Sequence, residues 1–341
     1  MDVMSWLLDG EPAVQRAVRT RLLGEPLESP ECGVLSSRLM VEGTIPAILD
    51  SQDPDGHWGG RDRFYTAKYS GTVWNLIILA ELGADGSDDR IRRAVSAILD
   101  DGQHRASGGF STTRAKRDEG GLGSMVIPCL TGNMVFALIR LGYGGDPRAQ
   151  RAIDWITTYQ RFDDAEGTAP TGWPYDRLEM CWGRHTCSMG IVKALKGLAE
   201  LGFGHSAEVD RTLGEGAEWL LKHHVHKRSH DLSRDSKPGW RRFGFPRMYQ
   251  TDVLEILLLL TRLGFNDPRM DDAFELLESR RDKSGCWILQ ESFNPRFSAP
   301  IEVVGEPSRW VTLSALEVLA RRSALAVAPF SSEDTRSSRA G

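Results

Sequence analysis

Two thiols and an imidazole lie close together in the sequence, at Cys181, His185 and Cys187. If residues 181–185 form helix, Cys181 and His185 lie on one face, because side chains four residues apart are helical neighbours. Zinc prefers thiolate and imidazole ligands and takes three or four of them in a tetrahedron. The stretch therefore predicts a zinc site. Cys129 is the best remote ligand, since it opens the preceding helix of the same type.

A metal-free interpretation of the same residues stays open. A free cysteine is often a small buried apolar side chain, and a lone histidine is commonly a hydrogen-bonded core residue. The run of histidines from His223 to His230 also invites a metal site. Its place at the end of an outer helix favours a simpler role, because basic side chains stabilise helix C-termini.

A repeated Leu-Gly pair marks the elements that position these residues. Glycine just beyond a helix end is the expected C-terminal signal. The four glycines lie 59, 60 and 62 residues apart, and such a period indicates stacked units that bury their apolar faces against one another. The pairs are Leu82-Gly83, Leu141-Gly142, Leu201-Gly202 and Leu263-Gly264.

The helices ending at these pairs are apolar on most faces, which predicts that they are buried. The helices that follow alternate charged and apolar residues and should face solvent. Alternating inner and outer helices predict an all-α fold, an α/α toroid of about five helix hairpins plus an N-terminal helix starting near Pro12. Inner helices are expected at 69–82, 129–141, 186–201, 250–263 and 310–321, outer ones at 88–99, 146–158, 206–221 and 267–279, and an early helix at 35–51.

Composition argues against a nucleic-acid-binding, a secreted or a membrane-spanning protein. The net charge of -5 gives no support for nucleic-acid binding. The first 14 residues lack the basic start of a signal peptide, and the longest apolar run, 134–139, is too short to span a bilayer. Five cysteines without disulfide-framework spacing predict a reducing, cytoplasmic setting. Residues 1–325 are expected to form one domain, and 326–341 a disordered tail.

Two motifs resemble a known group of toroids. Residues 52–58, Gln-Asp-Pro-Asp-Gly-His-Trp, resemble the glutamine–tryptophan repeat of squalene cyclases, and 281–287 is a weaker copy. His185-Thr186-Cys187 resembles the position of the zinc histidine in protein prenyltransferase β subunits, and Cys129 that of their zinc cysteine. Over roughly residues 36–322 the chain thus resembles the protein prenyltransferase and squalene-cyclase superfamily. The resemblance implies a zinc-dependent transferase or terpenoid-cyclase-like enzyme acting on an isoprenoid.

Two departures limit what the resemblance implies. Prenyltransferases carry an aspartate two residues before the zinc cysteine, where this chain has Ile127. Cys181 or Cys187 could replace that ligand. The acidic Asp-x-Asp-Asp motif that protonates squalene in class II cyclases is absent, so squalene cyclase activity is not expected.

The inner helices should begin at one end of the ring, so their first turns should line one cavity. Asp252 and Tyr249 are the candidate catalytic residues there. Asp252 could accept a proton, pair with Arg309 or orient a ligand histidine, although a polar residue opening a helix can also be a plain cap. The residues expected to line the substrate cavity are Lys68, Trp74, Trp173, Trp182, Arg309 and Trp310.

Three functions therefore stay open. The first is a zinc enzyme whose aromatic-walled cavity takes an isoprenoid or another small apolar substrate. The second is a binding or scaffold protein in which Cys129, Cys181, His185 and Cys187 close a structural zinc site and leave no place for substrate. The third is a metal-free carbohydrate-active barrel, which would need two cavity carboxylates.

Overall fold

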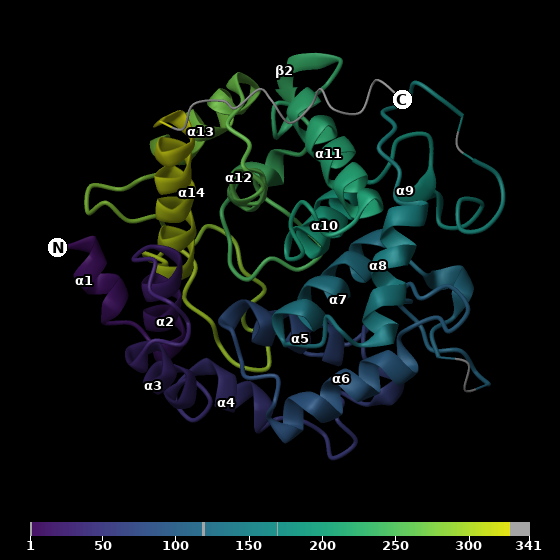
Figure 1. Cartoon of the computed structure of the whole chain (residues 1–341), viewed down its shortest axis with the longest axis horizontal. Coiled ribbons are helices and arrows are strands. Elements are labelled where there is room, and N and C mark those ends of the chain that lie inside the picture. The colour runs from purple at the N-terminus through teal and green to yellow at the C-terminus, as the bar shows by residue number, and fades with distance from the viewer. Residues whose placement is uncertain (1, 118–119, 169, 328–341) are drawn as a thin grey trace.

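Six helices surround a common axis in the computed structural model (Figure 1), which describes residues 2–117, 120–168 and 170–327. Each of the six contributes to the lining of one central cavity. They are α2 (Pro12–Arg21), α5 (Thr72–Leu82), α7 (Pro128–Arg140), α10 (Ser188–Ala199), α12 (Val253–Arg262) and α14 (Arg309–Val327). The predicted toroid and its five inner helices are confirmed, and α2 fills the sixth place in the ring.

The outer helices have one apolar face each. In α6 the buried residues Ile91, Ala94, Val95 and Ile98 recur at helical spacing, whereas nearly all of α5 is buried. The helices outside the ring are α1 (Val3–Leu8), α3 (Pro30–Arg38), α4 (Thr44–Leu49), α6 (Asp89–Asp101), α8 (Pro147–Tyr159), α11 (Ala207–Lys222) and α13 (Asp271–Ser279).

Shorter elements lie in the connections between the helices. They are α9 (Glu179–Trp182), the hairpin β1 (Lys227–Arg228) and β2 (Asp231–Asp235), and the 3-10 turns η1 (Arg61–Arg63), η2 (Gly123–Met125), η3 (Pro238–Arg241) and η4 (Pro268–Met270). Within the described ranges, no helix combines the length and the apolar character needed to cross a bilayer. The predicted tail lies almost wholly outside the described residues.

The helix predicted at 35–51 is wrong, because the chain breaks there into α3 and α4. Gly43 adopts a φ of 85°, which glycine tolerates and other residues rarely adopt. The new helix start is capped from a distance: the Glu11 carboxylate accepts hydrogen bonds from the Thr44 amide (3.0 Å) and hydroxyl (2.9 Å). The cap therefore ties the start of the outer helix α4 to the start of α2.

The two glutamine–tryptophan loops make the same contacts. The backbone amides of Trp58 and Trp287 donate to the hydroxyls of Thr72 (3.2 Å) and Thr312 (2.9 Å), near the starts of α5 and α14. Their indole N–H groups donate to the last turns of the preceding outer helices, at Ile48 (2.9 Å) and Leu277 (2.8 Å). Each tryptophan therefore ties the end of an outer helix to the start of the next inner helix.

Helices α7 and α10 pack backbone against backbone. A Cβ atom on Gly132 would lie 2.2 Å from the carbonyl oxygen of Lys193, and one on Gly197 would lie 2.6 Å from the carbonyl oxygen of Gly132. Side chains cannot fit between these segments, so the two glycines fix the distance between the helices that carry Cys129 and Cys187.

Candidate functional site

The largest cavity among the inner-helix starts, of about 770 Å³, is lined by all four predicted zinc ligands and is called the mouth cavity below. Cys129 is the second residue of α7, Cys187 precedes α10, and Cys181 lies in α9. His185 follows α9. The structure thus brings these four residues to one cavity, together with Lys68 and Tyr249.

These four side chains do not form a recognisable metal site. In the described part of the chain, no group of three His, Cys, Asp or Glu residues is arranged to hold a metal ion. The predicted helical pairing of Cys181 with His185 is wrong, because α9 ends at Gly183, whose backbone is extended. His185 instead lies beside Asp164, with 3.7 Å between Nδ1 and Oδ1. The structure therefore shows no preformed zinc site in its described part, and zinc binding stays a prediction.

Two thiols of the mouth cavity, Cys129 and Cys181, are held protonated. Burial raises the pKa of Cys181 to about 12, and the nearby Cys187 acts in the same direction. Burial also raises the pKa of Cys129 far above its ordinary value, with further contributions from Cys181 and Cys187. Without a cation to stabilise a thiolate, Cys129 and Cys181 are therefore apolar wall rather than nucleophiles.

An aromatic wall closes one side of the mouth cavity. The Lys68 ammonium lies 4.6 Å from the ring centroid of Tyr249, 4.8 Å from that of Tyr65 and 5.6 Å from that of Trp74. Tyr69 stacks on Phe293 at 3.8 Å beneath them. The sequence pointed to Lys68, Trp74 and Tyr249 but not to Tyr65 or Phe293, which lie in loops outside the repeated helices.

Tyr249 can donate a hydrogen bond but is a poor base. Burial, followed by the contact with Tyr69, raises the pKa of Tyr249 to about 12. The two hydroxyl oxygens are 3.3 Å apart. At neutral pH the Tyr249 phenol therefore stays protonated.

The charged lining of the mouth cavity is mainly basic. Asp164 is the one carboxylate among the described lining residues, against Lys68, Arg228 and Lys237. It lies 3.4 Å from Nε2 of His223 and accepts a hydrogen bond from the Ser229 hydroxyl. Burial opposes its ionisation, but the Ser229 hydrogen bond and His223 outweigh it and lower the pKa of Asp164. The cavity therefore attracts anions.

Three of the predicted substrate residues lie elsewhere. Trp173 donates its indole N–H to the Gly123 carbonyl (2.9 Å), and Trp182 is buried against Trp155. The guanidinium of Arg309 lies over the ring of Trp6, 4.7 Å away. Trp173 and Trp182 pack in the outer loops, because their backbones lie outside the ring. Arg309 is the first residue of α14, but its side chain packs against α1. Trp310 does reach the centre of the ring, where it stacks on Phe245 at 4.7 Å.

Asp252 is not in the mouth cavity, and the prediction that it faces Cys129 and His185 is not met. One carboxylate oxygen accepts from the Glu255 amide (2.7 Å), which caps α12. The other accepts from the Gly244 amide (3.1 Å) and from Nε of Arg247 (2.6 Å). Its partner is thus Arg247 rather than Arg309. Burial raises the pKa of Asp252, although Arg247 opposes the shift.

We expect Asp252→Asn to lower the free energy of unfolding by about 3 kcal/mol, because it breaks a buried ion pair and leaves Arg247 partly uncompensated. Urea denaturation followed by circular dichroism measures the loss. Asp88→Asn is the control, since Asp88 caps the outer helix α6 at a partly exposed position. A variant as stable as wild type but inactive would instead support the catalytic role predicted from the sequence.

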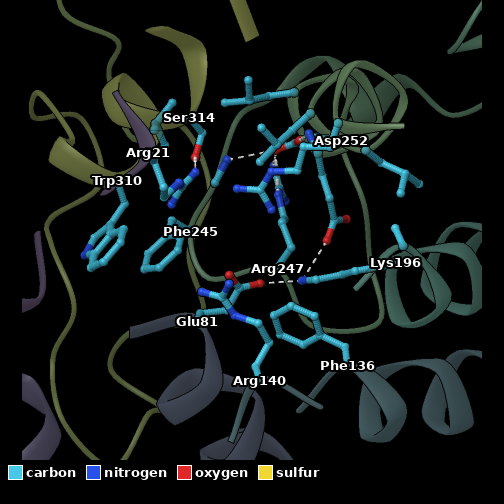
Figure 2. A pocket seen from close by; sticks show the side chains of 18 of the residues that line it. Arg21, Glu81, Phe136, Arg140, Lys196, Phe245, Arg247, Asp252, Trp310 and Ser314 are labelled. Carbon is cyan, nitrogen blue, oxygen red and sulfur yellow. Dashed lines mark hydrogen bonds and ion pairs between the residues drawn. The ribbon is translucent and has the colours of Figure 1, made fainter. Parts of the chain in front are cut away.

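The central cavity itself is small and ionic (Figure 2). Its volume is about 90 Å³. Lys193, which is fully buried, contacts Glu255 at 2.6 Å, Glu255 contacts Lys196 at 3.2 Å, and Lys196 reaches Glu81. Burial lowers the pKa of Lys193 to about 8, against the effect of Glu255. The expected aromatic-walled central cavity is therefore filled largely by ion pairs.

One charged residue from each inner helix or its cap forms a ring of alternating sign around this cavity, called the charge ring below. Glu317 accepts from Nε of Arg21 (2.6 Å) and Nε of Arg262 (2.8 Å), and Arg140 lies 3.7 Å from Glu200. Four members directly precede the Leu-Gly pairs, so the repeated Glu-Leu-Gly and Arg-Leu-Gly were the sequence signal. The members in ring order are Arg21, Glu81, Arg140, Glu200, Arg262 and Glu317.

No protein-family model and no curated protein matches the chain. Among solved structures, it is similar to a variant of type II terpene cyclase MstE from Scytonema in complex with geranylgeranyl dihydroxybenzoate, at 15% identity over 92% of this chain and 87% of that one, with a TM-score of 0.43. The apo form of MstE is 16% identical over 92% of this chain and 89% of that one, with a TM-score of 0.42. A protein from Actinoplanes is 14% identical over 82% of this chain and 97% of that one, with a TM-score of 0.29. The first two belong to the terpenoid-cyclase class that the sequence resembles, while the toroid is established by the chain's own helices.

Proposed function

We propose that the chain is a terpenoid-cyclase-like enzyme that binds an apolar molecule with an anionic head group, such as a prenyl diphosphate, in the mouth cavity. The observation that carries the proposal is Lys68. Its ammonium lies among three aromatic rings, and no carboxylate of the described residues lies within ion-pair distance of it. An ammonium at a cavity wall without a counter-ion is a ready partner for an anion.

The sizes of the two cavities favour the mouth as the substrate site. About 770 Å³ lies within the range of roughly 300–1,000 Å³ that is usual for small-molecule sites. About 90 Å³ in the centre of the ring is too little for an isoprenoid. The carbohydrate alternative is not favoured, because Asp164 is the single carboxylate in the described lining of the mouth cavity.

The chemistry would begin with departure of the head group. The carbon–oxygen bond of an allylic diphosphate breaks, the diphosphate oxygen keeps the electron pair, and a carbocation remains. Aromatic faces stabilise such a cation within about 6 Å, which suits Tyr65 and Tyr249 in the lining of the mouth cavity. A double bond of the same chain can then attack the cation and close a ring. His185, which Asp164 helps to orient, would accept the proton that the cation loses.

Isothermal titration calorimetry with farnesyl diphosphate and farnesol tests the proposal. We expect the diphosphate to bind at least about tenfold more tightly, because a charged hydrogen bond contributes about 1.5–3 kcal/mol. Lys68→Gln should remove most of this difference and leave farnesol binding unchanged. Turnover is followed by diphosphate release and by mass spectrometry of the hydrocarbon product.

Lys283→Gln is the control, because Lys283 is an exposed lysine in a loop that does not line the mouth cavity. Equal binding of the diphosphate and the alcohol, with no effect of Lys68→Gln, would show that the proposed head-group site is wrong. Zinc and the cytoplasmic setting remain separate predictions, and metal analysis of the purified protein by mass spectrometry tests the first.

A further inference from the structure

Arginines outnumber their carboxylate partners at the end of the lumen where the inner helices finish, called the floor below. Glu317 is a single carboxylate serving three guanidinium groups: Arg21, Arg262 and Arg321, the last at 3.1 Å. A buried carboxylate can balance one positive charge, so a further anion would be stabilised beside it.

Two other arginines of the floor are even less well matched. Arg140 has its carboxylate partner, Glu200, at 3.7 Å, longer than the roughly 2.7–2.9 Å of a charge-assisted hydrogen bond. Arg16 donates to the Ser36 hydroxyl (2.9 Å) and to the Gly83 carbonyl. In the described part of the chain, no carboxylate lies within ion-pair distance of Arg16. Burial, and then repulsion from Arg140, lowers the pKa of Arg16, which agrees with an excess of positive charge.

The whole ionic network of the lumen shows the same excess. The charge ring is balanced, with three cations and three carboxylates. Beyond the ring, the network adds three carboxylates, Asp252, Glu255 and Glu291, and five cations. The added cations are Arg16, Lys193, Lys196, Arg247 and Arg321, so the network is positively charged overall.

The floor has both space and access for a small anion. The central cavity of about 90 Å³ holds about three waters at roughly 30 Å³ each, which is also room for one tetrahedral oxyanion. Figure 2 shows Arg21 and Arg140 on different sides of this space. A second cavity, of about 1230 Å³, lies at the ends of α5 and α7 and is lined by Arg16, Arg21 and Arg140, of which Arg21 and Arg140 also line the first. An anion between the two cavities can therefore reach all three arginines, and the second cavity offers a route from solvent.

From this geometry we infer that the floor of the lumen is a binding site for phosphate or a phosphomonoester, held by Arg16, Arg21 and Arg140. The planar guanidinium presents paired donors that match two phosphate oxygens at once. Because Arg16 and Arg21 come from α2 and Arg140 comes from α7, one anion with four oxygens could bridge helices from separate repeats. The inference is independent of the proposed reaction, which uses the other end of the ring.

Titration calorimetry and thermal unfolding with inorganic phosphate, at constant ionic strength set by sodium chloride, test this site. We expect saturable binding by wild type and a stabilisation that chloride does not give. Arg140→Gln should weaken phosphate binding by about tenfold or more, because it removes a charged hydrogen-bond donor. Arg16→Lys should also weaken binding, since lysine keeps the positive charge but lacks the paired donors of the guanidinium. Phenyl phosphate, added in a parallel titration, distinguishes a phosphomonoester ligand from free phosphate.

Arg148→Gln is the matched control, because the side chain of Arg148 is 37% exposed, close to the 38% of Arg140, and lies on the outer helix α8. Lys68→Gln controls for the mouth cavity and should bind phosphate as wild type does, whether or not farnesyl diphosphate binds there. The inference is overturned if wild type shows no saturable binding, if Arg140→Gln binds as wild type does, or if Arg148→Gln loses binding equally.

Discussion

Glu317→Gln is expected to lower the free energy of unfolding by about 3–5 kcal/mol, the usual cost of removing one partner of a buried ion pair. The Glu317 side chain is 2% exposed and joins Arg21 of α2 to Arg262 of α12. A neutral amide at this position would leave both guanidinium groups without their counter-ion. Urea denaturation of the variant and wild type at pH 7 measures the difference.

The same carboxylate gives stability a defined pH dependence. Burial would raise the pKa of Glu317, but Arg21 and Arg262 outweigh burial and hold it well below its ordinary value of 4.5. Its contribution is therefore fully present above about pH 4.5 and is lost as pH falls through the lowered value. Glu42→Gln is the control, because the exposed pair of Glu42 with Arg38 is screened by solvent and should contribute little to stability. Equal losses in the two variants would contradict the importance of burial.

Gly132→Ala is expected to lower the free energy of unfolding by about 3 kcal/mol or more. The new methyl group would lie 2.2 Å from the carbonyl oxygen and 2.3 Å from the carbonyl carbon of Lys193. These are backbone atoms, so α7 and α10 would have to separate, and overpacking of this kind is costly. Thermal and urea denaturation measure the loss.

Gly214→Ala is the control for Gly132→Ala, because Gly214 is also a helical glycine but has open space around it. Gly214 lies within α11, and a Cβ atom there would meet nothing within 4 Å. The substitution should raise the free energy of unfolding by up to about 1 kcal/mol through helix propensity. If Gly132→Ala were also neutral or stabilising, the close contact of α7 with α10 would not be what holds that part of the ring together.

The fold was predictable because its signal is repeated. Each Leu-Gly pair reports a helix end on its own, and four of them at nearly constant spacing indicate one architecture. The break between α3 and α4 was missed because its cap comes from Glu11, which is 33 residues away in the sequence. A local pattern cannot reveal a partner supplied by a distant helix.

The sequence indicated where the site lies, but not what each of its residues does. The sequence placed Cys129, His185 and Tyr249 at the starts of inner helices, and all three line the mouth cavity. The roles predicted for individual residues depended on loop geometry that periodicity does not determine. Gly183 ends α9 before His185, and the loop after η3 brings Arg247 to Asp252. Four members of the charge ring lie within the repeat itself, each directly before a Leu-Gly pair. The alternating sign of these four residues was the sequence signal for the ring.

The contact that closes the ring also bears on how the chain is made. Arg21 and Glu317 are 296 residues apart in the sequence, yet they form one of the buried ion pairs of the lumen. At roughly 5–20 residues per second, α2 would leave the ribosome about 15–60 s before its partner exists. Until then, only the segments that have already been synthesised can cover the apolar residues of α2. These residues later pack against the other helices of the ring. Co-translational folding of this toroid should therefore produce an open arc first, and that arc is the species on which a chaperone would act.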